Sequence, residues 1–254
     1  ALLADSAEEF AAQIIRLCRD AGLRQNLRSN GIEAANERFG WTNIGRRLAF
    51  ACQRLSSPKP DRTWIMDVPF DRITMAQTLD RIGQMIDSGA PHYLATANVD
   101  FLVQSRTDRD LRRILHKAHC VVCDGTPLVW LSHLLGHAIP ERVAGSDLVP
   151  QLLARAETAG WSVFFLGGQE EVLDQAVSNV KREHPKLRVA GSYSPPFAPF
   201  EKMDHKDICS RIREARPDIV LVSFGCPKQE KWIAHNYNAA GASVCIGVGA
   251  TIDF

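Results

Sequence analysis

The stretch VVCDGTPLVW, residues 121–130, contains the change of pattern on which the fold depends. A β-branched run ends at Cys123, the segment 124–127 turns the chain, and an apolar run starts the next element. Asp124 therefore stands where a buried strand leaves the core. Two interpretations of it stay open: the N-cap of a helix that begins near Pro127, or a carboxylate that accepts a proton from an attacking hydroxyl.

The same alternation of strand and helix extends along the chain from Trp64 onward. Segments with helical periodicity, such as 75–89, 146–160 and 169–184, separate short apolar runs. Strands separated by helices are typical of βαβ units and a mostly parallel sheet. The sequence therefore predicts an α/β fold, a Rossmann-like, mostly parallel sheet flanked by helices. Its expected strands are 64–67, 92–96, 120–123, 162–166, 187–191, 218–223 and 243–248.

The first 55 residues have a different pattern, which predicts an all-helical segment. Residues 5–18 open with Asp5 or Ser6 as N-cap and continue with acidic residues and then apolar residues at helical spacing. A second helix is expected to end at Gly40, and a third helical stretch follows over 41–55.

A change of composition then separates this segment from the rest of the chain. Residues 56–62, SSPKPDR, contain two prolines, two serines and alternating charges, as linkers do. We therefore expect a helical segment over 1–55, a linker over 56–62 and an α/β domain over 63–254.

The overall composition excludes several classes of protein. The formal net charge of +1 gives no bulk electrostatic argument for binding nucleic acid. No apolar run approaches the roughly 18 residues of a membrane-spanning helix, and the first residues do not resemble a secretory signal. The seven cysteines are odd in number and scattered, which argues against a disulfide framework and for a reducing compartment. We therefore expect a cytoplasmic location.

Polar and glycine residues follow several of the expected strands. Ligands of open α/β sheets bind beyond the carboxyl ends of the strands, so these loops form the expected functional edge. Thr96 and Asn98 follow one strand, where a turn and a ligand contact are both open interpretations. Gly167 and Gly168 follow another, and they would let a backbone approach a phosphate at a helix N-terminus.

The stretch FGCPKQEKW, 224–232, brings positive charge and an amide to the expected start of a helix. Lys228, Gln229 and Lys231 all fall in its first turn, where cations oppose the helix dipole. A bound phosphate would reconcile this arrangement, and a solvated surface turn is the alternative.

Arg142 lies in a comparable place, in PERVAGSDL, 140–148, before an expected cap at Ser146 or Asp147. It either pairs with a carboxylate or holds a diphosphate through two hydrogen bonds.

Taken together, these blocks resemble the WecG/TagA/CpsF family of bacterial glycosyltransferases, glycosyltransferase family 26. The resemblance covers roughly residues 63–254 and rests on six blocks in order: TANVDFLVQSR, VVCDGTPLVW, ERVAGSDLVP, VFFLGG, FGCPKQEKWI and IGVGATIDF. It implies an inverting enzyme that moves a sugar from a UDP-sugar to a polyprenyl-diphosphate-linked acceptor at the inner face of the cell membrane, in cell-surface polysaccharide synthesis. The implied sugar is N-acetylmannosamine, its uronic acid or a hexose.

The resemblance also implies roles for individual residues. Asp124 corresponds to the proposed general base, and Thr96 lies in the same pocket beside Asn98. Arg142 and Gln229 are suited to the leaving-group phosphates or to the transferred sugar.

The remaining expected substrate contacts surround these residues. Gly125 would keep the backbone clear of the sugar, and the other contacts are Thr126, Gly167, Gly168, Lys228 and Lys231. No Asp-x-Asp-like motif stands at a strand end, so we expect neither a required metal ion nor a cofactor, and UDP-sugar enters only as the donor substrate.

Two parts of the chain depart from the family pattern. Members continue past the equivalent of Phe254 with a basic, aromatic tail that covers the active site and meets the membrane surface. Residues 1–55 resemble instead the C-terminal end of a GT-B glycosyltransferase, which implies a fused second glycosyltransferase. A family-specific helical extension is the alternative interpretation, and a homo-oligomer stays open.

Two other functions were weighed against glycosyl transfer. A nucleotide-sugar-binding module, inactive without the tail or a partner, fits the same motifs. A Rossmann oxidoreductase does not, because the chain lacks GxGxxG and an acid about 20 residues beyond it.

Overall fold

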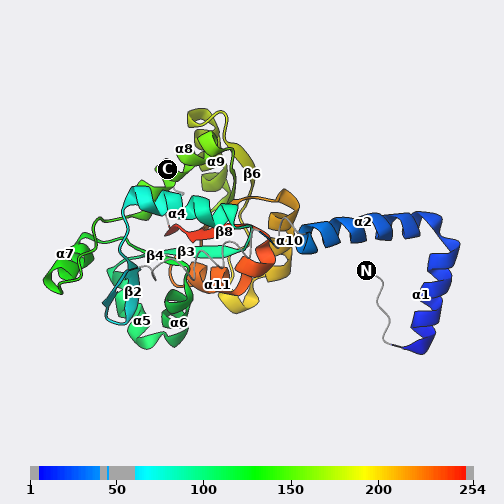
Figure 1. The fold of residues 1–254 in the computed structure, drawn as a ribbon, viewed down its shortest axis with the longest axis horizontal. Coiled ribbons are helices and arrows are strands. Elements are labelled where there is room, and N and C mark those ends of the chain that lie inside the picture. The colour runs from blue at the N-terminus through cyan, green and yellow to red at the C-terminus, as the bar shows by residue number, and fades with distance from the viewer. Residues whose placement is uncertain (1–5, 41–44, 46–60, 250–254) are drawn as a thin grey trace. The chain divides into compact units, whose positions relative to one another are not determined.

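The computed structural model describes residues 6–40, 45 and 61–249, and the chain divides into two units, residues 1–53 and 54–254 (Figure 1). The third expected helical stretch, 41–55, lies outside the described residues apart from Gly45, as does most of the expected linker.

The first unit contains two helices, α1 (Ala7–Arg19) and α2 (Ala21–Phe39). Ser6 is the N-cap of α1, and its hydroxyl accepts a hydrogen bond of 3.2 Å from the Glu9 N–H. A carboxylate oxygen of Asp20 accepts one of 2.8 Å from the Leu23 N–H, at the start of α2. The helix α2 ends directly before Gly40, as predicted.

The second unit is built on a six-stranded sheet. Its strands are β3 (His92–Ala97), β4 (Cys120–Cys123), β5 (Ser162–Gly167), β6 (Arg188–Tyr193), β7 (Ile219–Ser223) and β8 (Val244–Gly247), in the order β4-β3-β8-β7-β5-β6. Every neighbouring pair is parallel. The predicted α/β fold is therefore confirmed.

Helices cover both faces of this sheet. Alternate strand residues point to opposite sides, so Val220 and Val222 belong to one core, and Ile219 and Leu221 to the other. The first core includes residues of α5 (Val99–Thr107), α6 (Arg109–Lys117), α10 (His205–Ala215) and α11 (Lys228–Ala240). The second includes residues of α4 (Met75–Asp87), α8 (Gly145–Ala159) and α9 (Glu170–Glu183). Figure 1 shows α4 and α11 on opposite sides of the strands.

The predicted strand at 64–67 is confirmed only for Trp64 and Ile65, and it does not belong to the main sheet. This region is an antiparallel hairpin of β1 (Arg62–Ile65) and β2 (Val68–Asp71), separate from the main sheet. Met66 and Asp67 form its turn with φ angles of 47° and 67°, the conformation that two-residue hairpin turns require. Neither residue is a glycine or an asparagine, so the usual turn signal is absent from the sequence.

The hairpin covers the edge strand β4. Asp71 is buried, and its carboxylate accepts a hydrogen bond of 2.7 Å from the Val121 N–H while it pairs with Arg62 at 3.0 Å. The backbone of an edge strand thereby receives a partner that the sheet cannot supply.

Two further elements belong to the second unit. A short 3-10 helix, η1 (Phe200–Lys202), precedes α10. The helix α7 (Thr126–Leu134) follows β4, and Figure 1 shows it projecting away from the sheet. No helix within the described residues is long and apolar enough to cross a membrane.

Candidate functional site

Asp124 lies at the carboxyl end of β4 with its carboxylate directed to the start of α8. Its backbone N–H donates to the Ala97 carbonyl at 2.9 Å, which continues the ladder with β3 one residue past the strand. One carboxylate oxygen accepts a hydrogen bond of 3.3 Å from the N–H of Gly145, the first residue of α8. The side chain is 27% exposed, so ligands can reach it.

The predicted role of Asp124 as the cap of α7 is wrong. The N-cap of α7 is Gly125, which makes no side-chain cap, and Asp124 instead serves α8. A strand-end acid can cap any helix whose N-terminus lies nearby in space, and the sequence shows only the next helix along the chain. Since α8 begins 21 residues later, this partner could not be seen in the local pattern.

Burial shifts the acidity of Asp124. It raises the pKa of the carboxyl above its ordinary value, and the nearby Asp147 carboxylate adds to the rise. The Gly145 N–H and the Arg142 guanidinium partly offset both effects, because they favour the ionised form. A carboxylate with a raised pKa is a stronger base than an ordinary one.

Arg142 joins Asp124 to the first turn of α8. One guanidinium nitrogen lies 3.9 Å from the Asp124 carboxylate, and the other donates to the Asp147 carboxylate. The predicted cap at Ser146 or Asp147 is wrong, because the N-cap is Ala144 and makes no side-chain bond. Arg142 therefore pairs with carboxylates, which is the first of the two interpretations of this residue, the second being that it holds a diphosphate.

Thr96 and Asn98 lie at the end of β3, next to β4. The Thr96 hydroxyl donates a hydrogen bond of 3.0 Å to the Gly247 carbonyl of β8, and the side chain is buried. Asn98 is the N-cap of α5, and its side-chain oxygen accepts a hydrogen bond of 3.3 Å from the Phe101 N–H. Both therefore have structural roles at the predicted edge.

Gln229 lies in the first turn of α11 and is also buried. Its side-chain oxygen accepts a hydrogen bond of 3.1 Å from the Gly249 N–H, just past β8. Its amide nitrogen donates one of 2.7 Å to the carboxylate of Glu230. The sequence interpretation passed over Glu230, a buried acid directly beside a predicted site residue.

A cavity of about 1260 Å³ opens at the carboxyl ends of β5, β7 and β8. Its lining includes the predicted contacts Gly167, Gly168 and Lys228. Gly167 has a φ of +104°, and a Cβ there would lie 2.4 Å from the Ser223 carbonyl oxygen. The fold therefore requires glycine at this position, whatever ligand the cavity holds.

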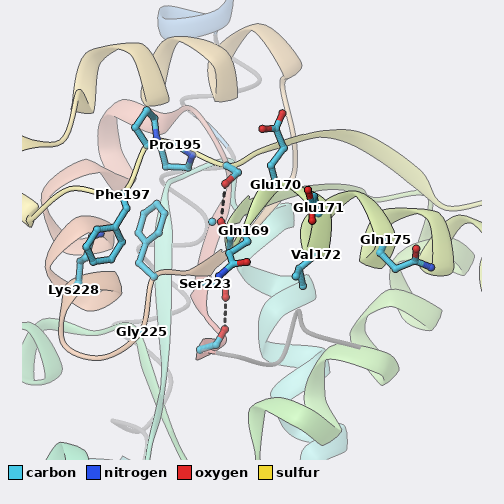
Figure 2. A pocket seen from close by; sticks show the side chains of 16 residues that line it. Gln169, Glu170, Glu171, Val172, Gln175, Pro195, Phe197, Ser223, Gly225 and Lys228 are labelled. Atoms are coloured by element: carbon cyan, nitrogen blue, oxygen red, sulfur yellow. Dashed lines mark hydrogen bonds between the residues drawn. The ribbon is translucent and has the colours of Figure 1, made fainter.

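The two walls of the cavity differ in charge, as Figure 2 shows. The α9 wall carries Glu170, Glu171 and Gln175. The opposite wall carries Phe197 and Lys228, whose ammonium lies 4.9 Å from the centre of the Phe197 ring. Burial lowers the pKa of Lys228. An anion at the start of α9 would face two carboxylates, so the Lys228 side is the better place for a phosphate.

Phe197 is a second residue that sequence reasoning missed. Its ring is 98% exposed, although it lines the cavity. Its sequence context, SPPFAPF, has no strand or helix periodicity, so nothing in the local pattern marks it as a site residue.

The predicted residues fall into two groups joined by the end of β8. Asp124, Arg142 and Thr126 lie around the end of β4 and do not line the cavity. Thr96 contacts Gly247, and Gln229 contacts Gly249, which lines the cavity. Lys231 lies apart from both groups, since its ammonium is 2.7 Å from the Asp108 carboxylate.

Comparison with known proteins gives a family and relatives. Residues 63–254 match the sequence model of the Glycosyl transferase WecG/TagA/CpsF family. The N-acetylglucosaminyldiphosphoundecaprenol N-acetyl-beta-D-mannosaminyltransferase of Staphylococcus aureus strain NCTC 8325 / PS 47 is 27% identical over 203 residues, which are 79% of this chain and 77% of the relative. The proteins of the same name from strains COL and MRSA252 have the same identity and coverage.

Proposed function

Because the chain is a glycosyltransferase that belongs to the WecG/TagA/CpsF family, we propose that it moves a sugar from a UDP-sugar to an acceptor linked to polyprenyl diphosphate, with inversion at the anomeric carbon. N-acetylmannosamine is the first sugar to test, because the relatives are named for its transfer. The acceptor class follows from the same names, in which the acceptor is a diphosphoundecaprenol.

The observation that carries the proposal is the environment of Asp124. Its carboxylate is partly exposed at the carboxyl edge of a parallel sheet, where ligands of such sheets bind. Burial has raised its pKa, and the Gly145 N–H and Arg142 hold it in place. In an inverting transfer, this carboxylate takes the proton of the acceptor hydroxyl while the hydroxyl oxygen attacks the anomeric carbon. The bond from that carbon to the diphosphate oxygen breaks on the opposite face, and UDP leaves with the electron pair.

The cavity supports a nucleotide donor. Lys228 supplies a positive charge for the diphosphate, and the exposed ring of Phe197 offers a face on which a base can stack. Glu170 and Glu171 on the opposite wall suit hydroxyl groups and N–H donors of a nucleoside. Gly125 supports a sugar close to Asp124. A Cβ at Gly125 would only touch Leu128 at 3.6 Å, so the fold itself does not require glycine at this position, and room for a ligand is the reason we propose for it.

The helix that follows Asp124 supports a lipid-linked acceptor. Trp130 is 69% exposed and Leu134 84% exposed, four positions apart on one face of α7. Leu128 and Ser132 are buried on the same helix and hold it in place. Exposed tryptophan and leucine beside the proposed base suit contact with an acyl or prenyl chain at a membrane surface.

The test is transfer by the Asp124→Asn variant. We expect kcat to fall by roughly 100- to 10,000-fold, the usual contribution of a general base, while calorimetry with UDP gives the wild-type affinity. Lys228→Met should show the reverse, a weaker affinity for UDP. Wild-type turnover by Asp124→Asn would disprove the assigned base, and UDP binding without any transfer by the wild type would favour a binding module.

A further inference from the structure

We infer that Glu230 is a positioning residue, whose carboxylate holds the carboxamide of Gln229 in the orientation that the transfer reaction uses. The inference rests on the proposed function together with the role that the family resemblance implies for Gln229 at the leaving group or the transferred sugar. It assigns a role to a buried acid that the proposed mechanism leaves unused.

The two contacts of Gln229 define its orientation. The Gly249 N–H donates to the side-chain oxygen at 3.1 Å, and the side-chain nitrogen donates to the Glu230 carboxylate at 2.7 Å. A flipped carboxamide would place its N–H against the Gly249 N–H and its oxygen against a carboxylate. Glu230 and the Gly249 N–H together disfavour the flip and fix which end of the carboxamide carries the hydrogen-bond donors.

The pair packs directly against the backbone at the end of β8. A Cβ at Gly247 would lie 2.8 Å from the Gln229 amide nitrogen and 3.0 Å from a Glu230 carboxylate oxygen. The carbonyl of the same glycine accepts the hydrogen bond of Thr96. The orientation of Gln229 is therefore tied to the strand that also positions Thr96.

Helix capping does not account for an acid at this position. Glutamate at the third position of a helix often bonds to the N–H of the N-cap residue, but the N-cap of α11 is Pro227, which has no N–H. Glu230 is 3% exposed, and its second carboxylate oxygen has no hydrogen-bond partner among the described residues. Such burial is unfavourable, and an apolar side chain would avoid it. The acid provides an acceptor for the Gln229 amide at 2.7 Å, and the Cys226 thiol lies beside the same carboxylate.

The experiment is a double-mutant cycle on the enzyme, with Gln229→Leu, Glu230→Leu and both together. We expect each single variant to lose roughly 10- to 100-fold in kcat/KM for the donor, the size of a lost hydrogen bond to a charged group. The double variant should lose no more than Gln229→Leu alone, because the two residues act as a unit. Glu230→Gln keeps a side-chain oxygen and should restore kcat/KM to within about 3-fold of wild type.

A second measurement separates positioning from general stability. In ¹⁵N-labelled protein, Glu230→Leu should move the side-chain amide signals of Gln229. Asn236→Ala should not move them, although Asn236 is an equally buried polar residue of α11. Independent, multiplicative losses in the cycle would overturn the inference, as would wild-type kcat/KM for Glu230→Leu or Gln229→Leu. If the wild type transfers no sugar, the proposed function fails, and the amide signals still decide whether Glu230 orients Gln229.

Discussion

Asp124 is subject to opposing influences, and their balance sets the pH range in which it can act. Burial and Asp147 raise its pKa, whereas the Gly145 N–H and Arg142 lower it. The net result is a raised pKa, so the carboxylate loses its basic form at a higher pH than an ordinary aspartate does. The proposed reaction therefore slows as the pH falls through this raised value.

Removal of the Arg142 charge tests this balance. In Arg142→Gln the pKa of Asp124 should rise further, because the ionised form loses a cation at 3.9 Å. The acidic limb of the kcat/KM profile should then move to higher pH, in addition to any drop in rate. Arg155→Gln, which removes a surface arginine paired with Asp80, is the control and should leave the profile unchanged. An unshifted limb in Arg142→Gln would show that the titrating group is not Asp124.

Two glycines of the site should respond in opposite ways to alanine. Gly125 is extended and has room for a Cβ, so Gly125→Ala should raise the free energy of unfolding by about 0.5 kcal/mol and still lower the rate of transfer. Gly167→Ala forces alanine into a left-handed conformation and into the Ser223 carbonyl, and should lower that free energy by roughly 2 kcal/mol or more. Urea unfolding and transfer assays on both variants check this, and a fully active Gly125→Ala would argue against a sugar beside Gly125.

Strand-end residues such as Asp124 and Thr96 could be located from the sequence because apolar runs stop visibly before polar ones, and Gln229 because Pro227 marks the start of a helix. Their hydrogen-bond partners could not be located from the sequence. The bond from the Gly145 N–H to Asp124 and that from the Gly249 N–H to Gln229 span 21 and 20 residues, and helical periodicity carries no information at that range. Glu230 is hidden for a different reason, since a glutamate in a first helical turn normally indicates a solvated surface.

At the scale of elements, the parallel sheet was predictable and the hairpin was not. Strands of a sheet covered on both faces form continuous apolar runs, and these stand out between amphipathic helices. The β1–β2 hairpin has no such run and turns through Met66 and Asp67. Asp67 lies 3.6 Å from both Arg112 and His116 of α6, so contacts with a distant helix accompany a turn that local propensity disfavours.

The exposed face of α7 gives a prediction at this scale. The double variant Trp130→Ser/Leu134→Ser should transfer sugar normally to a short, water-soluble prenyl-diphosphate acceptor. Transfer to the long-chain acceptor in vesicles should be slower by more than about 10-fold, because about 2 kcal/mol of apolar contact is lost per large side chain. The matched control is Phe10→Ser, which changes an exposed aromatic residue of α1. Equal rates with both acceptors would remove α7 from the proposed lipid contact.

At the scale of the whole molecule, the two hydrophobic cores draw on residues from Ile65 onward within the part of the chain that the structure describes. The α1 helix buries none of its side chains. A chain that begins at residue 54 should therefore have the same free energy of unfolding for the α/β unit, within about 0.5 kcal/mol. Thermal unfolding of both forms checks this, and a marked loss of Tm would show that the helical unit supports the other.

Burial of Glu230 should make stability depend on pH. Its pKa is about 7 in the folded protein, against about 4.3 for an exposed glutamate. The folded state thus binds the proton more tightly, so this group contributes stability at low pH that is lost as the pH rises from about 4.3 to about 7. Near pH 8, Glu230→Gln should be more stable than wild type by an amount on the order of 3 kcal/mol. The nearby Cys226 thiol is present in both proteins, so it does not account for a difference between them. The prediction is contradicted if the difference in free energy of unfolding between Glu230→Gln and wild type is the same at pH 4 and at pH 8.

The order of the strands also fixes the dimensions of any molecule that occupies the whole edge. The cavity lies at the ends of β5, β7 and β8, whereas Asp124 ends β4, three strands from β7. Neighbouring strands are about 4.8 Å apart, so this separation is roughly 14 Å. A ligand anchored by its base in the cavity must be elongated for its reactive carbon to reach the carboxylate. If the proposed donor binds with its base in the cavity, the sheet therefore selects donors by length. A nucleotide with one phosphate fewer is then expected to bind in the same cavity and to hold its sugar short of Asp124.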